Sequence, residues 1–138
     1  IDNTLSTHGN PEPYLGVKDW VHTMAEGGIQ LIIVSNNNEK RVSTFAKKLG
    51  LPYIARAAKP LPFAFHQAMK RMHCFPCNAA VIGDQLFTDM LGGSLAGIRG
   101  ILVTEITPEK GWFFRLKRRL ERRILEKMKI VGDSVYIK

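Results

Sequence analysis

The sequence predicts an α/β fold with a doubly wound parallel sheet, and two observations lead to this prediction. Short apolar runs of strand length alternate with amphipathic helical patterns along the chain. The connections between successive apolar runs are about a dozen residues long, which is enough for a helical crossover between parallel strands. With 138 residues, 45% of them hydrophobic, the chain suits one domain built around a single core.

Two helices and two strands are expected in the first part of the chain. Residues 13–27 form an amphipathic pattern that ends at two glycines, as helices commonly do. Residues 29–34 form a short apolar run, which is typical of a strand covered on both faces. A second helix is expected at residues 39–49, where a glycine follows, and a weak strand at residues 53–55.

The second part of the chain continues the alternation. A helix is expected at residues 62–72, a buried strand at 79–82, a helix at 87–96 and a last strand at 101–104. A doubly wound sheet binds its ligands just beyond the carboxyl ends of its strands. The residues at those ends are therefore the candidates for a functional site.

Polar residues follow the predicted strands at this edge of the sheet. They are Asp2, Ser35, Asn36, Lys59, Asp84 and Asp89. Each one alone is compatible with a structural role, such as a helix N-cap or a solvated lysine. Together they suit a phosphoryl group bound with Mg²⁺. This ion prefers a few carboxylates plus phosphate and water, and a lysine and a hydroxyl suit the remaining phosphate oxygens.

Two cysteines raise the question of a zinc or redox site. Cys74 and Cys77 form a CxxC pair beside His73, and His66 lies one helical face away. A zinc site needs four ligands at compatible spacing and the sequence has no second CxxC, while a thioredoxin-type pair opens a helix that follows a strand. This pair closes a predicted helix, so we expect it in a turn. Without a disulfide framework it suits a reducing compartment.

The positive charge of the chain is concentrated at its C-terminal end. The net charge is +8, of which residues 1–108 carry +2 and residues 109–138 carry +6. We therefore divide the chain into a core of residues 1–108 and a basic tail of residues 109–138, which is expected to contain an amphipathic helix. The apolar stripe of this helix recurs at three- and four-residue steps and consists of Phe113, Leu116, Leu120, Ile124 and Met128.

Three interpretations of the basic tail remain open. Its helix can dock the apolar stripe on the core and leave the charges in solvent. Residues 112–130 can instead lie on an anionic membrane, with Trp112 at the level of the headgroups and each basic residue contributing about 1 kcal/mol. The arginines can also bind RNA or a ribosomal surface, although nucleic acid is the less favoured partner.

Four short motifs resemble those of the haloacid dehalogenase (HAD) superfamily of aspartyl-phosphate hydrolases. They are IDNT, VSNN, AAKP and GDQLFTD, and they occur in the family order within residues 1 to 104. The short links between them leave no place for a cap domain, as in the capless class III (IIIA) branch. With the basic tail, the set resembles the YqeG-type phosphatases, relatives of the mitochondrial and plastid phosphatidylglycerophosphate phosphatases.

The resemblance implies a Mg²⁺-dependent phosphomonoester hydrolase that acts through an aspartyl-phosphate intermediate. The first motif of the family reads DxDxT, and its first aspartate is the nucleophile. Asp2 and Thr4 match the second and third fixed positions, so the nucleophile and the strand that carries it would come directly before Ile1. The chain of residues 1–138 is therefore expected to be inactive by itself.

The resemblance also implies roles for the three aspartates. Asp2 would act as general acid and then as general base, which requires its carboxyl within hydrogen-bond reach of the bridging oxygen. Its backbone carbonyl would bind Mg²⁺. Asp84 would bind Mg²⁺ directly, and Asp89 would bind it or orient its waters.

Residues from two other segments would hold the phosphoryl group. By the same resemblance, Ser35 and the backbone amide of Asn36 would bind a phosphoryl oxygen. Lys59 would neutralise negative charge between the nucleophile and the phosphate, so that two anions can approach each other. It would thus serve both catalysis and substrate binding.

The substrate class implied by the resemblance is a membrane-associated phosphate ester such as phosphatidylglycerophosphate. The alternative is a non-catalytic HAD-like module that binds an anionic membrane or RNA through its basic tail, and an aspartate before Ile1 would favour the enzyme. We expect a cytoplasmic protein, peripheral on the membrane if the tail binds lipid, or an organellar one if a targeting segment precedes Ile1. Capless relatives often use a neighbouring subunit as a lid, so a homo-oligomer is a further expectation.

Overall fold

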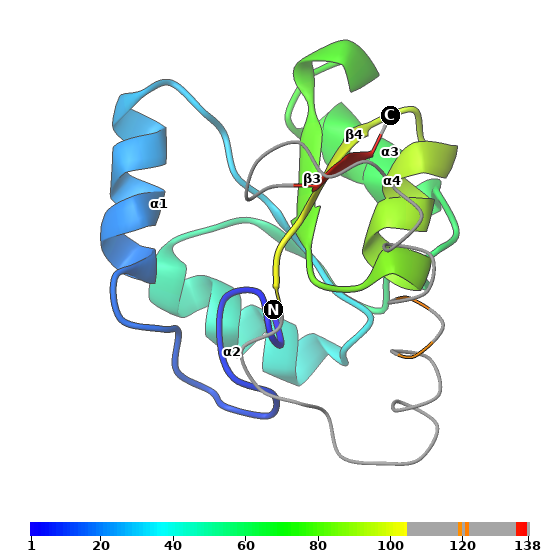
Figure 1. Cartoon of the computed structure of the whole chain (residues 1–138). Coiled ribbons are helices and arrows are strands. Elements are labelled where there is room, and N and C mark those ends of the chain that lie inside the picture. Colours follow the sequence, from blue (N-terminus) through cyan, green and yellow to red (C-terminus); the bar gives the residue numbers. More distant parts are fainter. Residues whose placement is uncertain (105–118, 120, 122–134, 138) are drawn as a thin grey trace.

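The computed structural model describes residues 1–104, 119, 121 and 135–137 of the chain (Figure 1). Its α-helices are α1 (Val17–Glu26), α2 (Glu39–Leu49), α3 (Phe63–Arg71) and α4 (Leu91–Leu95). A 3-10 helix, η1 (Pro76–Asn78), precedes β3, and a π-helix, η2 (Leu86–Met90), runs directly into α4. The strands are β1 (Ile33–Val34), β2 (Tyr53–Ile54), β3 (Ala80–Gly83), β4 (Arg99–Leu102) and β5 (Val135–Ile137).

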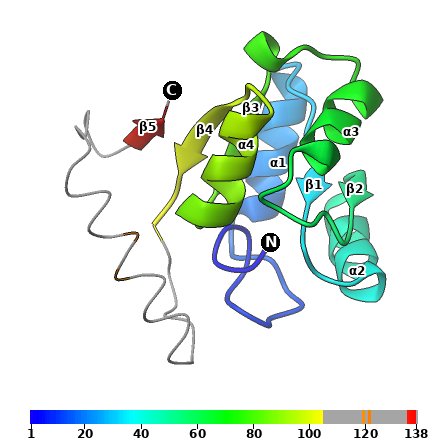
Figure 2. The same cartoon turned by 90° about the vertical axis from the view of Figure 1, so that its right-hand side faces the viewer.

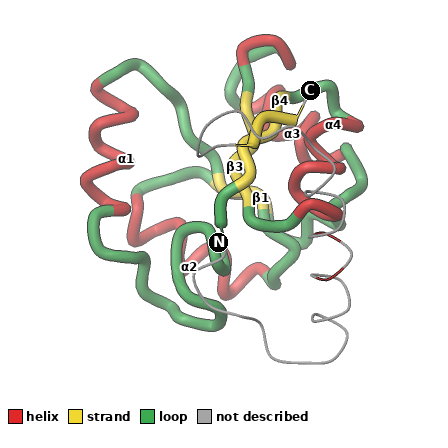
Figure 3. The backbone as a smooth tube through the Cα atoms, viewed as in Figure 1, coloured by secondary structure: helices red, strands yellow, loops and turns green. Residues whose placement is uncertain are grey.

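The strands form two groups within the described part of the chain. The first group pairs β1 with β2 in parallel, and the second has the order β3-β4-β5. The pairing of β3 with β4 is parallel and that of β4 with β5 antiparallel. Helices connect the parallel strands, so the prediction of an α/β fold with parallel strands is confirmed (Figure 3).

The element bounds agree best with prediction around α2 and α3. The predicted helix at 39–49 matches α2, and the one at 62–72 differs from α3 by one residue at each end. The helix expected at 13–27 begins only at Val17, and the one expected at 87–96 is split between η2 and α4.

The strand expected at 29–34 is shorter than expected, and the strand expected to be buried at 79–82 is partly exposed. Only Ile33 and Val34 of the run at 29–34 form a strand, and Ile29 keeps 52% of its surface exposed. In β3, Ile82 is 40% exposed. The physical reason is that β1 and β3 are not paired with each other among the described residues, so neither strand has neighbours on both sides there.

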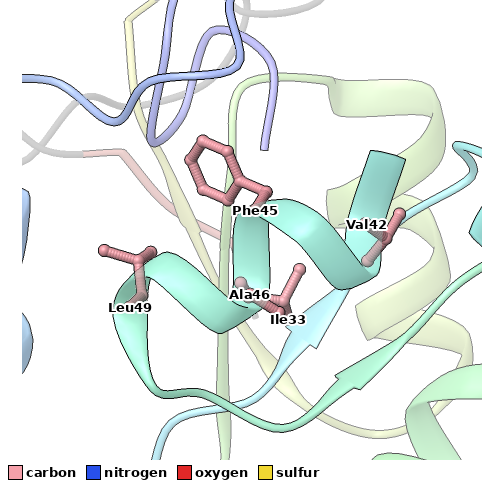
Figure 4. Close-up of a cluster of buried hydrophobic side chains, with 5 residues drawn as sticks. All are labelled: Ile33, Val42, Phe45, Ala46 and Leu49. Atoms are coloured by element: carbon pink, nitrogen blue, oxygen red, sulfur yellow. The ribbon is translucent and has the colours of Figure 1, made fainter. Parts of the chain in front are cut away.

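The first core cluster joins α2 to β1. Apolar residues of α2 recur at helical spacing and pack against Ile33: they are Val42, Phe45, Ala46 and Leu49 (Figure 4). The helix begins where the Asn38 side chain accepts a hydrogen bond from the Arg41 backbone N–H, at 3.0 Å. It ends at Gly50, whose φ of 66° is in the left-handed region that glycine adopts readily.

The helix α3 covers the other face of β1. Successive side chains of a strand point to opposite faces, and here Ile33 packs with α2 whereas Ile32 and Val34 pack against the cluster that includes Ala64 and Ala68 of α3. Further along, α3 also packs against residues next to and within β3. The two helices therefore enclose the β1 layer between them, as the doubly wound prediction requires.

A cavity of about 170 Å³ lies between β1 and β3. Its walls include Ile33 and Val34 from one strand, Val81 and Ile82 from the other, and Ile1. The N-terminus lies between the β1–β2 pair and the β3–β4 pair (Figure 2). The carboxyl ends of both groups of strands therefore face the first residues of the chain.

The basic tail lies mostly outside the described residues, so the predicted domain boundary at 108 and the amphipathic helix stay predictions. In the C-terminal segment, residues 119, 121 and 135–137 are described. Glu121 is buried, with 3% of its surface exposed, and β5 pairs with β4. The described residues include no helix long and apolar enough to cross a membrane.

Candidate active site

The carboxylate of Asp2 is fixed by three donors. Its Oδ1 accepts hydrogen bonds from the Gly9 backbone N–H at 2.8 Å and from Arg41 Nη2 at 2.5 Å, and its Oδ2 accepts one from Asn37 Nδ2 at 2.7 Å. Burial alone would raise the pKa of the Asp2 carboxyl, but these hydrogen bonds and the positive charge of Arg41 outweigh it. The pKa is lowered, so the charged form is favoured.

Lys59 connects the end of β1 to η2. Its Nζ donates to the backbone carbonyl of Val34 at 3.0 Å and to Asp89 Oδ1 at 2.6 Å. The Asn36 side chain holds the lysine backbone from both sides, because its Oδ1 accepts the Lys59 N–H at 2.7 Å and its Nδ2 donates to the Lys59 carbonyl at 3.1 Å. The loop after β1 therefore sets the position of the lysine.

The two aspartates after β3 lie close to the N-terminal loop and to Lys59. Thr4 Oγ1 donates to Asp84 Oδ1 at 3.1 Å, and Asp89 Oδ2 accepts the Gln85 N–H at 3.2 Å. Both aspartates are buried, with 5% and 6% of their surface exposed. Gly83 makes this arrangement possible, since a Cβ atom there would stand 2.5 Å from Asp89 Cγ.

Ser35 is buried at the carboxyl end of β1. Its backbone N–H donates to the backbone carbonyl of Ile54 at 2.9 Å, and its own carbonyl accepts the Ala57 N–H at 3.0 Å. Its Oγ accepts the Asn37 N–H at 3.2 Å. The hydroxyl therefore lies at the base of the loop whose residues hold Asp2 and Lys59.

The amino nitrogen of Ile1 lies where these segments meet. Burial lowers the pKa of this amino group and the Lys59 ammonium lowers it further, whereas the carboxylates of Asp89, Asp2 and Asp84 act in the opposite direction. Ile1 and Thr4 also line the cavity between β1 and β3 together with Lys59 and Asp89. A residue joined to Ile1 would therefore enter a space surrounded by four charged groups from three segments.

The structure brings together all six residues predicted from the sequence. Three further residues, for which the sequence predicted no contact, donate hydrogen bonds to the predicted aspartates. Arg41 and Asn37 bind Asp2, and Thr4 binds Asp84. Asn36 contributes its side chain to Lys59, in addition to the backbone amide expected at the site. No sequence signal identifies Arg41, because a basic residue in the first turn of a helix is usually a solvated one.

The carboxylates fit Mg²⁺ as two hard oxygen donors. Among the described residues, no group of three or more His, Cys, Asp or Glu side chains is arranged to hold a metal ion. Mg²⁺ usually binds one or two carboxylates plus phosphate and water, so Asp84 as a direct ligand, with Asp89 as a ligand or as an acceptor for metal-bound water, fits it. Cys74 and Cys77 are free thiols in the turn between α3 and β3.

The chain also matches a known family and a known relative in sequence. A HAD-hydrolase-like family model matches residues 56–107, which contain Lys59, Asp84 and Asp89. The "Probable phosphatase YqeG" of Bacillus subtilis (strain 168) is 42% identical over 132 residues, which are 96% of this chain and 77% of the relative. The chain belongs to the HAD superfamily of hydrolases. Its predicted enzyme class, a HAD-type phosphatase, is thereby confirmed.

Solved structures share the fold of this HAD chain. An uncharacterized protein from Listeria monocytogenes serotype 4b matches with a TM-score of 0.63 at 14% identity, over 93% of this chain and 96% of that one. YfnB of Bacillus subtilis, described as a HAD-hydrolase bound to magnesium, matches with a TM-score of 0.55 at 22% identity. That match covers 66% of this chain but only 45% of YfnB. At these identities the likeness concerns the fold alone.

Proposed function

We propose that this HAD chain belongs to a Mg²⁺-dependent phosphomonoesterase that acts through an aspartyl-phosphate intermediate. The nucleophile in this proposal is an aspartate directly before Ile1, two positions ahead of Asp2, as the motif DxDxT requires. The observation that supports it best is the environment of the Ile1 amino nitrogen. The next residue in the N-terminal direction would lie among Lys59, Asp84 and Asp89.

The chain's own residues divide the work of the two steps. Asp2 is charged in the chain without substrate, and the negative charge of a bound phosphate favours its taking up a proton. In the first step the nucleophile attacks phosphorus and the bond to the leaving oxygen breaks, while the protonated Asp2 gives its proton to that oxygen. In the second step Asp2 takes a proton from water as the water oxygen attacks phosphorus and the aspartyl–phosphorus bond breaks. Lys59 offsets negative charge between nucleophile and phosphate, and Ser35 with the Asn36 amide binds a phosphoryl oxygen.

Mg²⁺ in this proposal is held by Asp84 and by the backbone carbonyl of Asp2. Both oxygens of Asp89 already accept hydrogen bonds, one from Lys59 and one from Gln85, which suits it to orienting metal-bound water. When bound, Mg²⁺ supplies charge stabilisation to the phosphoryl oxygens, worth several kcal/mol. The magnesium named for YfnB is consistent with this cofactor but belongs to that protein.

The substrate class is proposed from the sequence of the basic tail. Its apolar stripe and basic residues suit an anionic membrane surface, where a lipid phosphate monoester such as phosphatidylglycerophosphate would be presented. The enzyme would then be cytoplasmic and peripheral on the membrane. Residues 112–130, which would make this contact, fall largely outside the described part of the chain.

The test uses an extended protein, in which an apolar strand of about five residues and then an aspartate precede Ile1. We expect it to release phosphate from p-nitrophenyl phosphate in the presence of Mg²⁺. The matched control carries asparagine in place of that aspartate and should release none, and neither should residues 1–138 alone. Equal phosphate release by the aspartate and asparagine forms would contradict the proposed nucleophile.

The metal assignment is tested in the same protein by the substitution Asp84→Asn. Loss of this carboxylate removes stabilisation of several kcal/mol, so we expect kcat to fall by about 10²-fold or more. Titration with Mg²⁺ should show saturation in the unsubstituted protein and none in the variant. Wild-type turnover by Asp84→Asn would show that Asp84 does not hold the metal.

A further inference from the structure

The two oxygens of the Asp2 carboxylate have unequal partners. Oδ1 accepts two hydrogen bonds, one from a backbone N–H and one from the charged guanidinium of Arg41. Among the described residues Oδ2 accepts one hydrogen bond, and its donor is the neutral amide of Asn37. Both oxygens belong to a charged carboxylate, but only the Arg41 donor adds a full positive charge of its own. Oδ1 is therefore held much more firmly than Oδ2.

Arg41 is itself fixed from two directions. Its backbone is in the first turn of α2, where its N–H binds the Asn38 side chain. Its guanidinium also donates to the carbonyls of Gly9 at 3.2 Å and Asn10 at 3.4 Å. Only 24% of the Arg41 side chain and 15% of the Asp2 side chain are exposed. The guanidinium is thus held in one position between the N-terminal loop and α2 and is not a mobile surface group.

We propose that Arg41 is a positioning residue that anchors Oδ1 of Asp2 and so leaves Oδ2 as the oxygen that transfers the proton. This inference rests on the proposed function, in which Asp2 is the general acid. A general acid must present one oxygen to the leaving group with its O–H bond aimed at it. The contact to the Asn37 amide is the one that can be exchanged for the leaving oxygen, because it is single and neutral.

The proton transfer is then assigned to a stated atom. As the phosphorus–oxygen bond of the ester breaks and its electron pair stays on the leaving oxygen, the Oδ2–H bond breaks and its proton moves to that oxygen. The carboxylate formed in this way is stabilised at Oδ1 by Arg41 and by the Gly9 N–H. In the second step a proton of the attacking water returns to Oδ2.

The test compares two substrates that differ in their need for a proton. The p-nitrophenolate ion leaves readily without one, whereas the alkoxide of glycerol 3-phosphate must be protonated as it leaves. In the extended protein we expect Arg41→Met to lower kcat on glycerol 3-phosphate by about 10²-fold, which is at the low end of general-acid contributions. Its kcat on p-nitrophenyl phosphate should change by less than about threefold, and KM little on either substrate.

Lys48→Met is the matched control. Lys48 also ties the N-terminal loop to α2, through the Pro11 carbonyl at 3.0 Å and through Glu12, but it does not contact Asp2. We expect Lys48→Met to leave the ratio of the two kcat values unchanged. The same selective loss in Lys48→Met would assign the effect to anchoring of the loop and would overturn the role of Arg41.

The conservative substitution Arg41→Lys supplies a second measurement if Arg41→Met does not fold. Lysine keeps the positive charge but not the planar fork, so kcat on glycerol 3-phosphate should fall by about tenfold. Equal losses on both substrates in the folded Arg41 variants would overturn the inference. Failure of the unsubstituted extended protein to hydrolyse either ester would instead contradict the proposed function.

Discussion

Lys59 and Asp89 form an ion pair in which 12% and 8% of the side chains are exposed. Such a pair is costly to break, because removal of one partner leaves the other charge buried and uncompensated, at about 3–5 kcal/mol. The lysine also satisfies the Val34 carbonyl at the end of β1. A group proposed to act on phosphate thus also holds the end of β1 to η2.

We predict that Lys59→Met lowers the free energy of unfolding by about 3 kcal/mol, because the Asp89 carboxylate is left buried without its partner. Methionine keeps a long unbranched side chain, so the change removes the charge with little loss of packing volume. Urea denaturation of residues 1–138 measures the effect. The double variant Lys59→Met with Asp89→Asn should be more stable than the sum of the two single effects, and additive losses would show that the two groups do not interact.

Residue identities at the strand ends could be predicted from the sequence, but their mutual contacts could not. A lysine in a loop and an aspartate in a helix do not reveal that they share a hydrogen bond of 2.6 Å. That contact depends on the loop after β1, where Asn36 binds the Lys59 backbone, and on Gly83, which leaves room for Asp89. Such details follow from tertiary packing, which single-residue patterns do not encode.

At the scale of elements, the segment that follows β3 depends on the C-terminal part of the chain. The Oε1 atom of Glu121 accepts the backbone N–H of Leu86 at 3.1 Å and of Phe87 at 3.5 Å. These are the first two residues of η2, whose N–H groups have no partner within the helix itself. A buried carboxylate from the tail thus caps the helix that carries Asp89.

We predict that Glu121→Ala lowers the free energy of unfolding by about 1–3 kcal/mol, because buried N–H groups lose their acceptor. Arg119→Ala is the matched control, since Arg119 is exposed and two residues away. It should change stability by less than about 0.5 kcal/mol. Thermal and urea unfolding followed by circular dichroism measures both. Equal effects of the two substitutions would show that Glu121 does not cap η2 in solution.

The bounds of α2 could be predicted because this helix carries its own start and stop residues. The bounds of α2 follow from the Asn38 cap, the apolar spacing and Gly50, all of which are local. The strand at 29–34 was predicted too long because its pairing depends on neighbours elsewhere in the chain. Similarly, the split of the predicted 87–96 helix into η2 and α4 follows no local signal that we can identify.

At the scale of the whole molecule, the order of strands and helices along the chain was enough to predict where the site lies. It was not enough to predict how the strands pair. Parallel strands with helical crossovers place all their carboxyl ends on one edge, so Asp2, Ser35 and Asp84 could be expected to meet there. The separation of β1 from β3 is a property of the sheet as a whole. The cavity between β1 and β3 has largely apolar walls. Among the described residues these two strands are not hydrogen-bonded to each other.

We predict that a parallel strand placed between β1 and β3 stabilises the molecule. Each edge would gain backbone hydrogen bonds, and apolar side chains would fill the space beside Ile33 and Val81. The extended protein should therefore unfold at a temperature higher by about 5 °C or more than residues 1–138, since about 1 kcal/mol shifts the midpoint of such a domain by several degrees.

The matched control for this effect has a glycine- and serine-rich segment of the same length before Ile1. Such a segment is flexible and has no apolar side chains for the cavity, so it should leave the unfolding temperature unchanged. Hydrogen exchange adds a local measurement, because the amides of β3 should be protected more strongly in the extended protein alone. If the apolar and the glycine-rich extensions gave the same unfolding temperature and the same protection, the cavity would not be a place for a strand, and the position assigned to the nucleophile would lose its structural support.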